Sequence, residues 1–458
     1  MNVLEISPKE YKLIFPSPYH VFNSISFNEL NKYKCDSVHY LIFRDSKTRL
    51  GLVIGEKNNV AFSPFSAPYG CFSFLDERID IDKIDESIQV LDGYLIEKKI
   101  SSTKFILPPF CYNVSFLSKL VNSLSRNNYK TSIIDLNHIF KTSFFDEKYK
   151  ENIHQKTRNN LNKALKQNFV FQKTEDIDLV YSINSINKEL RGFPLRMTLE
   201  QVKETLKIIK HDAFVVKLNQ DYVASALIYY TANNIVQIIY WGDILEFSSM
   251  KTMNFLSYKI FEYYKNAGIQ IVDLGPSSEN GIPNYGLCHF KESIGCVIEN
   301  KFTFEKKTVN VEFADYSKEF LEKSWEWLND PEIKHLTNTS CFSKEDQLKW
   351  FNSLPDRSDY KVFGVLESGK PIGVFGLKNI TAHDAEYWGY IGEKDSWGKK
   401  IGELIVKRAI EIAKEKNIGL LYLKVIPNNE RAIRLYEKMN FVCTGIENNL
   451  LIMQLCLK

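Results

Sequence analysis

The chain has 458 residues, of which 44% are hydrophobic and 25% charged, and it contains only 21 glycines and 14 prolines. This length predicts two to three domains, and the composition excludes long disordered or collagen-like segments. The formal net charge is +3, from 59 Lys and Arg against 56 Asp and Glu, so no overall field would hold a polyanion and no nucleic-acid partner is expected.

Neither a membrane span nor a signal peptide is predicted. No apolar run has the length that a membrane helix needs, and the start, "MNVLEISPKEYKLIF", lacks a basic segment followed by an apolar one. We therefore expect a cytoplasmic protein. Eight scattered cysteines without a Cys-x-x-Cys pair are typical of reduced packing residues, so we expect neither a disulfide framework nor a metal site.

The first two predicted segments alternate strand-like and helical runs. The first extends to about Asp146, with the strand-like runs "VHYLIFRD" and "LGLVIGE" and then a proline-punctuated turn, "SPFSAPYGCFSF". The second begins with a basic helical run, "NIHQKTRNNLNKALKQN". It continues with three strands joined by Asn and Asp turns over residues 213–243, and with a helix over Met250 to Ala267.

The third segment begins near Asn310. Two helices are predicted first, at 317–330 and 343–354, and strands follow at 360–367, 371–380 and 384–392. A glycine-containing loop and a helix come next, then a strand at 420–426, a helix at 429–440 and a last pair of strands.

The loop in "SWGKKIGELIVKRAI" combines two glycines and two lysines with the start of an amphipathic helix. Gly398 and Gly402 remove side chains where the loop would touch a ligand, and Lys399 and Lys400 add positive charge. The apolar stripe of the helix would pack on a sheet, so that the free N–H groups of its first turn point outward. This arrangement predicts a diphosphate site, although a glycine turn with solvated lysines has the same composition.

The next helix places three residues on one face. Asn429, Ala432 and Tyr436 are separated by three and four positions, which brings them to the same side of a helix. Asn429 could cap this helix. Tyr436 could be a core residue with its hydroxyl at the rim, or a catalytic residue.

Two stretches together, "EYWGYIGEKDSWGKKIGELIVKRAI" and "YLKVIPNNERAIRLYEKMNFVCTG", resemble the GNAT family of acyl-CoA-dependent N-acetyltransferases. The resemblance covers Asn310 to Lys458 and implies acetyl-CoA as the donor. It implies that the coenzyme A pyrophosphate binds at a loop formed by Trp397, Gly398, Lys399, Lys400, Ile401 and Gly402. Two residues depart from the family pattern: Trp397 replaces a basic residue, as in the ribosomal-protein acetyltransferase branch, and Lys400 replaces the middle glycine.

The resemblance also implies catalytic roles. Tyr436 would give its proton to the departing thiolate as the general acid. Tyr390, Ile391 and Gly392 of the splayed strand would hold the pantetheine arm and the carbonyl oxygen. Asn429 and Ala432 of the helix at 429–440 would border the coenzyme. Glu386 is the candidate base, with His335 as a second candidate and an exposed strand glutamate as the alternative.

The acceptor is suggested by "WEWLNDPEIKHLTNT", which resembles the acceptor-binding helix of family members that acetylate nucleotide-linked amino sugars in bacterial surface-glycan pathways. Trp327 would supply a stacking face, and Asn329 and His335 polar contacts. Alternating tryptophans are also common core anchors, and a protein N-terminal amine is the competing acceptor.

Residues 1–307 resemble the FemAB-like branch of the GNAT superfamily, in which two GNAT-like halves, here about 1–146 and 147–307, make one unit. The residues carrying this resemblance are "KTRNNLNKALKQ", "DLGPSSENGIPNYGLCHFKESIG", "SPFSAPYG" and "IIYWGD". Members transfer amino acids or acyl groups to cell-wall precursors or related acceptors. Carried over to this chain, the residues bordering the acceptor cleft would be Arg158, Trp241, Asp273 and Lys291. No Gly-x-Gly loop opens the helix at Met250, which leaves coenzyme A binding there without a motif.

The sequence therefore predicts a mixed α/β (α+β) bacterial-type protein of three GNAT-like units. Residues 1–307 would form the FemAB-like pair and residues 308–458 an acetyl-CoA-dependent N-acetyltransferase. Its acceptor would be a small-molecule amine, and a homodimer is possible. In the alternatives, the FemAB-like part is the principal acyl or aminoacyl transferase, or it is a binding module without chemistry.

Overall fold

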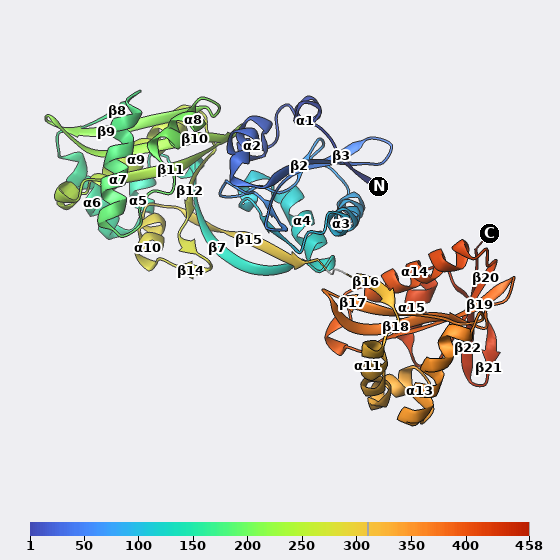
Figure 1. Ribbon diagram of the computed structural model, residues 1–458. Coiled ribbons are helices and arrows are strands. Elements are labelled where there is room, and N and C mark those ends of the chain that lie inside the picture. The colour runs from blue at the N-terminus through green and yellow to red at the C-terminus, as the bar shows by residue number, and fades with distance from the viewer. Residues whose placement is uncertain (309–310, 458) are drawn as a thin grey trace. The chain divides into compact units, whose positions relative to one another are not determined.

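The computed structural model describes residues 1–308 and 311–457. Its two compact units are Met1–Thr308, called unit 1, and Val309–Lys458, called unit 2 (Figure 1). Asn310, near which the third segment was predicted to begin, and Lys458 lie outside the described residues. Both units combine helices with mixed β-sheets, which confirms the predicted α/β class.

Unit 1 is built on one sheet of thirteen strands, in the order β1-β2-β3-β4-β6-β15-β7-β12-β11-β10-β9-β8, with β5 paired to β3. Its strands are β1 (Asn2–Glu5), β2 (Ser37–Arg44), β3 (Thr48–Lys57), β4 (Val60–Ser63), β5 (Ser73–Phe74), β6 (Ser102–Ile106), β7 (Lys130–Lys141), β8 (Phe169–Lys173), β9 (His211–Leu218), β10 (Asp221–Ala232), β11 (Ile235–Asp243), β12 (Ile271–Pro276) and β15 (Val297–Lys307), with a small separate pair, β13 (Ser278–Glu279) and β14 (Ile282–Pro283). Its helices are α1 (Pro8–Ile14), α2 (Ile25–Asn31), α3 (Ile81–Glu97), α4 (Val114–Arg126), α5 (Tyr149–Asn152), α6 (Gln155–Leu165), α7 (Ile177–Leu190), α8 (Leu199–Leu206), α9 (Thr252–Asn266) and α10 (Tyr285–Ser293).

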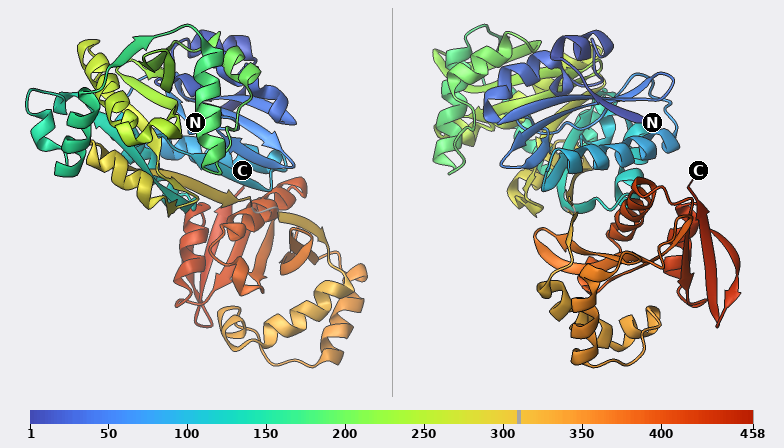
Figure 2. Two further views of the ribbon diagram at one scale, coloured as in Figure 1. Left: turned by 90° about the vertical axis from the view of Figure 1, so that its left-hand side faces the viewer. Right: turned by 45° about the vertical axis from the view of Figure 1, so that its right-hand side comes forward.

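Unit 2 is built on a seven-stranded sheet, in the order β16-β17-β18-β19-β20-β22-β21. Its elements are β16 (Val311–Asp315), α11 (Lys318–Asn329), α12 (Pro331–Leu336), α13 (Lys344–Ser353), β17 (Lys361–Glu367), β18 (Lys370–Lys378), β19 (Asp384–Ile391), α14 (Ile401–Glu415), β20 (Leu420–Val425), α15 (Glu430–Lys438), β21 (Val442–Glu447) and β22 (Leu450–Cys456). The hairpin of β21 and β22, dark red in Figure 2, ends the sheet. Each helix and strand predicted for this part of the chain is present.

One motif occurs three times in the chain. Parallel strands joined by a helix are β4 and β6 with α3, β11 and β12 with α9, and β19 and β20 with α14. All other strand pairings among the described residues are antiparallel. The repetition fits the predicted architecture of several GNAT-like units.

The two halves of unit 1 are interleaved through β15. This strand follows the whole second half in sequence, yet it lies between β6 and β7, with Thr303 opposite Ile106 and Val297 opposite Ile139 (Figure 1). The strand β7 in turn pairs with β12 of the second half. The sheet is therefore continuous, and a boundary near residue 146 does not divide it.

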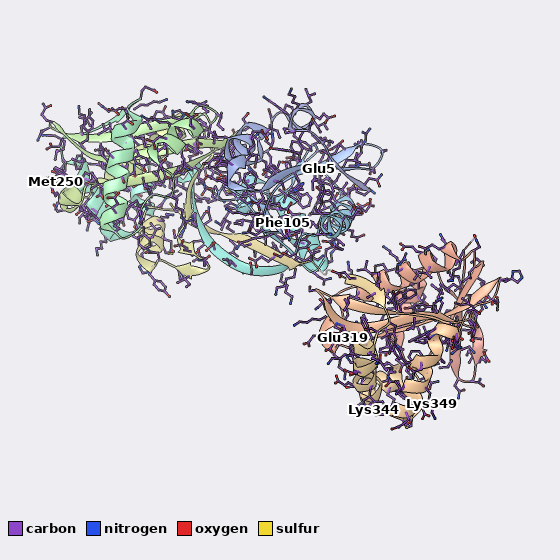
Figure 3. The ribbon with its side chains drawn as sticks, in the orientation of Figure 1. Glu5, Phe105, Met250, Glu319, Lys344 and Lys349 are labelled. Atoms are coloured by element: carbon purple, nitrogen blue, oxygen red, sulfur yellow. The ribbon has the colours of Figure 1, made fainter. Side chains whose placement is uncertain are left out.

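Unit 1 has two hydrophobic cores, and the first one also takes in residues of the second half, such as Val215 and Leu227. The first packs Ile84, Ile88 and Leu91 of α3 and helix α4 onto the strands around Phe105, which Figure 3 labels. The second packs α9, which follows the turn containing Met250, onto β9 to β12. The exposed charged side chains labelled in Figure 3 on α11 and α13 lie on the outer faces of those helices.

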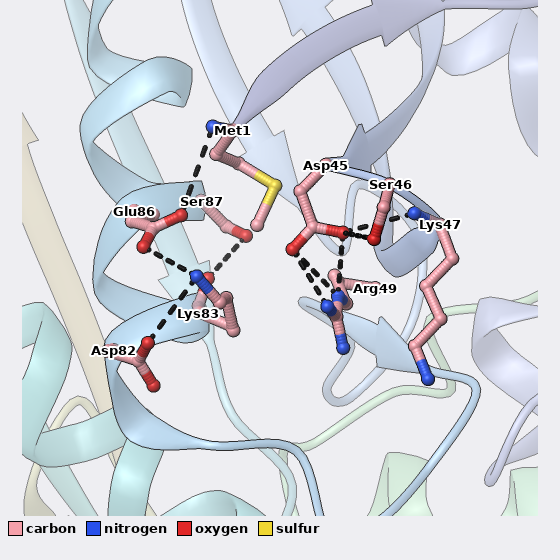
Figure 4. A network of polar contacts seen from close by, with 9 residues as sticks. All are labelled: Met1, Asp45, Ser46, Lys47, Arg49, Asp82, Lys83, Glu86 and Ser87. Atoms are coloured by element: carbon pink, nitrogen blue, oxygen red, sulfur yellow. Dashed lines mark hydrogen bonds and ion pairs between the residues drawn. The ribbon is translucent and has the colours of Figure 1, made fainter.

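Polar contacts fix the N-terminal edge of unit 1 (Figure 4). The ammonium group of Met1 lies 3.9 Å from Glu86 of α3, and Lys83 on the same helix bonds Glu86 at 2.8 Å. Asp45 closes the turn between β2 and β3, since it accepts from the backbone N–H of Lys47 and pairs with Arg49 at 2.9 Å. Exposed or half-buried pairs of this kind add little to stability.

His20 should make unit 1 sensitive to acid. Its ring is completely buried among aromatic rings, and burial lowers its pKa to about 3 from an ordinary value of 6.5. The unfolded chain then binds the proton more tightly, so the free energy of unfolding falls as the pH drops below about 6.5, by about 1.4 kcal/mol per pH unit. We expect His20→Phe to weaken this dependence between pH 6 and 4.

Hydrogen exchange of β6 amides in the full chain at several pH values would measure this effect. His289→Gln is the matched control, because His289 is exposed. An acid dependence that is identical in the wild type and in His20→Phe would contradict the prediction.

Candidate active site

The site of unit 2 begins where two parallel strands separate. β19 and β20 pair only at Asp384 to Glu386, opposite Leu420 to Tyr422. From Tyr387 onward β19 continues along β18 alone, so one of its backbone edges has no strand partner. Helix α14 starts beside this opening and packs on one face of the sheet, while α11 and α12 pack on the other.

A cleft of about 640 Å³ occupies the opening. It is lined from β19, from the loop before α14, from the end of β20 and from α15. The predicted site residues that line it are Glu386, Tyr390, Ile391, Trp397, Gly398, Lys400, Ile401, Gly402, Asn429, Ala432 and Tyr436. Segments that are far apart in the sequence thus meet around one cavity, whose size is typical of a small-molecule site.

The loop before α14 presents backbone N–H groups to the cleft. Gly398 has φ +81°, and Lys400 has φ +63°, so the chain turns sharply just before the helix. No side chain caps the N-terminus of α14, which leaves the N–H groups of its first turn available. The Cβ of a side chain at Gly402 would lie 2.9 Å from Leu435, so this glycine lets α15 approach the helix start. The arrangement suits an anion such as a diphosphate.

The charges near this loop differ from the sequence-based expectation. Lys399 forms an ion pair with Glu367 at 2.6 Å and does not line the cleft. Lys400 lines the cleft and has no ion pair among the described residues. Arg431, which the sequence analysis did not select, also lines the cleft, with its guanidinium 5.2 Å from the ring centre of Trp397. Free positive charge at this end therefore comes from Lys400 and Arg431.

Tyr436 lies on the wall of the cleft beside Tyr387. The ring centroids of the two tyrosines are 6.1 Å apart, and Phe441 packs on the other side of Tyr436 at 5.9 Å. Burial raises the pKa of Tyr436 to about 12. Its phenol is therefore neutral at physiological pH and can donate a proton.

Glu386 is held in place by two neighbours. The side chain is 6% exposed, with one carboxylate oxygen 3.1 Å from the ammonium of Lys378 and the other accepting from Asn379 at 3.1 Å. It still lines the cleft, on the face that also carries Trp388 and Tyr390. Glu386 is thus a fixed negative charge on the side of the sheet opposite α14.

The predicted acceptor residues lie outside the cleft. Trp327 is 4% exposed, donates to Glu393 at 3.0 Å and lies against Gly392, where an added Cβ would be 2.0 Å from the indole. Gly392 therefore serves this contact and does not line the cleft. Asn329 bonds the carbonyl of its own helix, and His335 is exposed. The cleft wall on this side is formed by Tyr360 and Trp388 and by other residues of the same segment, namely Leu328, Ile333 and residues 336–339.

In unit 1 the four predicted residues do not form one open site. Asp273 is completely buried and accepts from Asn137, Tyr112, Gln237 and the N–H of Gly275. Burial raises its pKa.

Lys291 is also buried, and its ammonium donates to the carbonyls of Leu274, Gly275 and Pro276. Burial lowers its pKa to about 8. Trp241 packs against Phe290, and the Nε of Arg158 is buried without a hydrogen bond in the described structure. Asp273 and Lys291 thus act as internal cross-links of the fold.

The sequence of unit 2 decides the family of this part of the chain. Residues 322–441 match the model of the Acetyltransferase (GNAT) family. Unit 2 is a GNAT acetyltransferase domain. The protein that carries this GNAT domain is an acyltransferase, as the sequence predicted.

Solved structures extend the comparison to the other unit. The crystal structure of FemX matches with a TM-score of 0.50 at 14% identity, over 68% of this chain and 98% of FemX. Unit 1 makes up 308 of the 458 residues. This likeness confirms that the chain contains a FemAB-like fold.

Two acetyltransferases match a smaller share of the chain. The N-acetyltransferase PseH of Campylobacter jejuni is 20% identical over 32% of this chain and 99% of its own, with a TM-score of 0.27. The spermidine N-acetyltransferase of Vibrio cholerae, in complex with CoA and spermine, is 20% identical over 32% of this chain and 95% of its own, with a TM-score of 0.31. A search among curated proteins gave no match.

Within the described ranges, no helix combines the length and apolar character needed to cross a membrane, and no group of three His, Cys, Asp or Glu side chains is placed to bind a metal.

Proposed function

We propose that unit 2 transfers the acetyl group of acetyl-CoA directly to a primary amine. The observation that carries this proposal is the cleft at the separation of β19 and β20. An uncapped helix N-terminus lies at one end of it and the neutral phenol of Tyr436 on its wall. The helix suits the pyrophosphate, and the phenol suits the sulfur of a leaving thiolate.

The residues present fit coenzyme A as the donor substrate. Gly398 leaves the backbone accessible, and Lys400 supplies an unpaired positive charge although it replaces a glycine of the family pattern. The backbone edge of β19 from Tyr387 to Tyr390, which has no strand partner among the described residues, can bind the amide groups of the pantetheine arm. An N–H group on the same edge would stabilise the negative charge that develops on the thioester oxygen.

The proposed reaction needs two proton transfers. The amine nitrogen attacks the carbonyl carbon, so that a C–N bond forms and the C–S bond breaks. Tyr436 gives its proton to the departing sulfur, and the amine loses a proton to Glu386, directly or through water. The carboxylate of Glu386 contacts Lys378 and lines the cleft, whereas His335, the other candidate base, is exposed and does not line it.

For the acceptor we propose a nucleotide-linked amino sugar of bacterial surface-glycan synthesis, with a protein N-terminal amine as the alternative. This proposal rests on the resemblance of residues 325–339. Unit 1 would then be a FemAB-like partner, either an acyl or aminoacyl transferase for a related acceptor or a binding module. An assay of the purified full chain with acetyl-CoA against both kinds of acceptor, read by release of the free thiol, tests the choice.

Donor binding is tested by titrating acetyl-CoA into the full chain in a calorimeter. We expect one site per chain. A stoichiometry of two would add a site in unit 1, and the absence of binding would refute the proposed function.

The charges at the loop predict which lysine holds the donor. We expect Lys400→Ala to weaken acetyl-CoA binding about 5- to 10-fold, because an exposed charge beside a phosphate contributes on the order of 1 kcal/mol. Arg431→Ala should have a similar effect. Lys399→Ala is the matched control and should change binding less than twofold, since its charge is already paired with Glu367.

The same calorimetric titration measures these variants, at low and high salt. If Lys399→Ala weakened binding as much as Lys400→Ala, the ion pair with Glu367 would not persist in the complex, and this assignment of charges would be wrong.

A further inference from the structure

A second cavity of unit 2, here called the aromatic slot, has a volume of about 270 Å³. Six aromatic side chains line it: Tyr316, Phe342, Trp350, Tyr360, Trp388 and Tyr390. Their rings touch in series, with centroids 5.5 Å apart for Tyr316 and Trp350, 6.0 Å for Trp350 and Tyr360, and 6.0 Å for Tyr360 and Trp388. The slot is therefore a largely apolar cavity with aromatic walls.

The aromatic slot adjoins the acceptor side of the cleft. Leu328, Tyr360, Trp388 and Tyr390 line both cavities. Side chains alternate along β19, so Trp388 and Tyr390 lie on the α11 face, while Tyr387 lies on the α14 face with the phosphate loop. A molecule in the slot would thus reach the cleft from the side opposite the coenzyme.

The lining of the slot favours an uncharged ligand. Arg357 stacks over Tyr360 at 4.4 Å, but its charge is paired with Asp359 at 2.9 Å. Asp346, the acidic residue on the wall, accepts from both the hydroxyl and the N–H of Ser343 at the start of α13. Asp346 is exposed and no basic side chain of the described residues lines the slot, so an anion placed there would lose its hydration without compensation.

The size and shape of the slot indicate a ring. Its volume is below that of most sites that bind a whole small molecule, so it would take one part of a ligand. Aromatic walls contact flat faces and edges better than they contact flexible chains, and stacked or edge-to-face rings attract beyond the area that they bury. The part of the ligand that fits is a flat ring or a pair of fused rings.

We propose that the aromatic slot binds an uncharged planar ring of the acceptor, so that the preferred acceptors are amines that carry such a ring. The inference rests on the proposed acetyl transfer by unit 2 and specifies its substrate class. The ring could be the base of a nucleotide-linked amino sugar or the aryl group of a small amine. Both sources share the chemistry that the slot recognises.

The test compares acceptors in pairs with the full-length protein. Tryptamine is paired with butylamine, and a uridine-diphosphate-linked amino sugar with the free amino sugar. In at least one pair we expect kcat/KM to be 10-fold or more higher for the member with the ring, and the pair that responds identifies the source of the ring. Equal kcat/KM within both pairs would overturn the proposal.

Variants locate the effect. Trp350→Ala should remove most of the preference for the ring and leave acetyl-CoA binding unchanged. Leu348→Ala is the matched control, because Leu348 belongs to the same helix, is 47% exposed and lines neither cavity. Phe342→Ala, in the connection before α13, opens the slot if Trp350→Ala does not fold. A loss of preference that is the same in Leu348→Ala would count against the slot.

A binding measurement separates this inference from the proposed function. Saturation-transfer NMR with tryptamine and with uridine diphosphate should detect binding of at least one of them to the wild-type protein. The signal should fall in the Trp350→Ala variant. If acetyl-CoA binds with one site while neither probe binds, the slot proposal fails and the acetyl transfer stands. If acetyl-CoA does not bind, the proposed function fails, whatever the probes do.

Discussion

Replacing Tyr436 by Phe is expected to lower kcat about 100-fold or more, and to change the affinity for acetyl-CoA less than twofold. The substitution removes only the hydroxyl, which has no hydrogen-bond partner among the described residues, so the packing of the ring on Tyr387 and Phe441 is preserved. General acid catalysis by a positioned side chain typically accounts for 10²- to 10⁴-fold of a rate. Steady-state kinetics and calorimetry on the same preparation measure the two quantities.

Tyr387→Phe is the contrast for this variant. Tyr387 lines the same cleft, but its hydroxyl lies close to Gly389, where an added Cβ would be 3.0 Å away. We expect less than a fivefold loss of kcat. If Tyr436→Phe and Tyr387→Phe lowered kcat equally, or if Tyr436→Phe turned over like the wild type, Tyr436 would not be the acid.

The pH profile adds an independent check on the acid. Since the pKa of Tyr436 is raised to about 12, the phenol stays protonated, and kcat/KM should rise with the fraction of neutral amine without falling again below about pH 10. A descending limb between pH 8 and 10 that disappears in Tyr436→Phe would show that the tyrosine ionises in this range. Such a limb would contradict the raised pKa of Tyr436, but it would still assign the proton donation to this phenol.

Sequence patterns predicted the elements of unit 2 well, because its helices carry strong amphipathic stripes and its strands are bounded by turn residues. The start of α14, for instance, was expected at the glycine loop, and it begins at Ile401. The position of β15 could not be read in the same way. Its eleven residues, Val297–Lys307, form a strand in any pairing, and only the assembled sheet decides that β6 and β7 are its neighbours.

The candidate site was predictable where a role depends on the backbone or on helix spacing. Gly398, Lys400, Ile401, Gly402, Asn429 and Tyr436 line one cleft, as the resemblance to the GNAT family implied. Roles that depend on contact with a residue far along the chain could not be predicted from the sequence. Lys399 and Lys400 are adjacent in sequence, but only Lys399 meets Glu367, and Trp327 is covered because Gly392 admits its ring. For Arg431 a signal existed, since it is a basic residue two positions after the capping Asn429.

Asp273 gives the largest effect that we expect on stability. Asp273→Ala should lower the free energy of unfolding of unit 1 by about 3 to 5 kcal/mol, the range found when one member of a buried polar network is removed. The reason is that four donors lose their acceptor inside the fold: the side chains of Asn137, Tyr112 and Gln237 and the N–H of Gly275. These donors come from both halves of unit 1, so the carboxylate links β7, β11 and β12 at the place where β11 and β12 cease to pair.

The measurement is hydrogen exchange of β7 and β12 amides in the full chain, which reports on unit 1 without assuming that the whole chain unfolds in one step. Asp221→Ala, at the exposed start of β10, is the control and should change stability by less than about 0.5 kcal/mol. Acetyl-CoA binding by unit 2 should be the same in both variants. If Asp273→Ala kept wild-type exchange and lost only an acyl transfer reaction of unit 1, Asp273 would contact a substrate, as the FemAB-like resemblance implied. If Asp273→Ala instead bound acetyl-CoA like the wild type and its β12 amides exchanged faster, the role of Asp273 would be to stabilise the fold of unit 1.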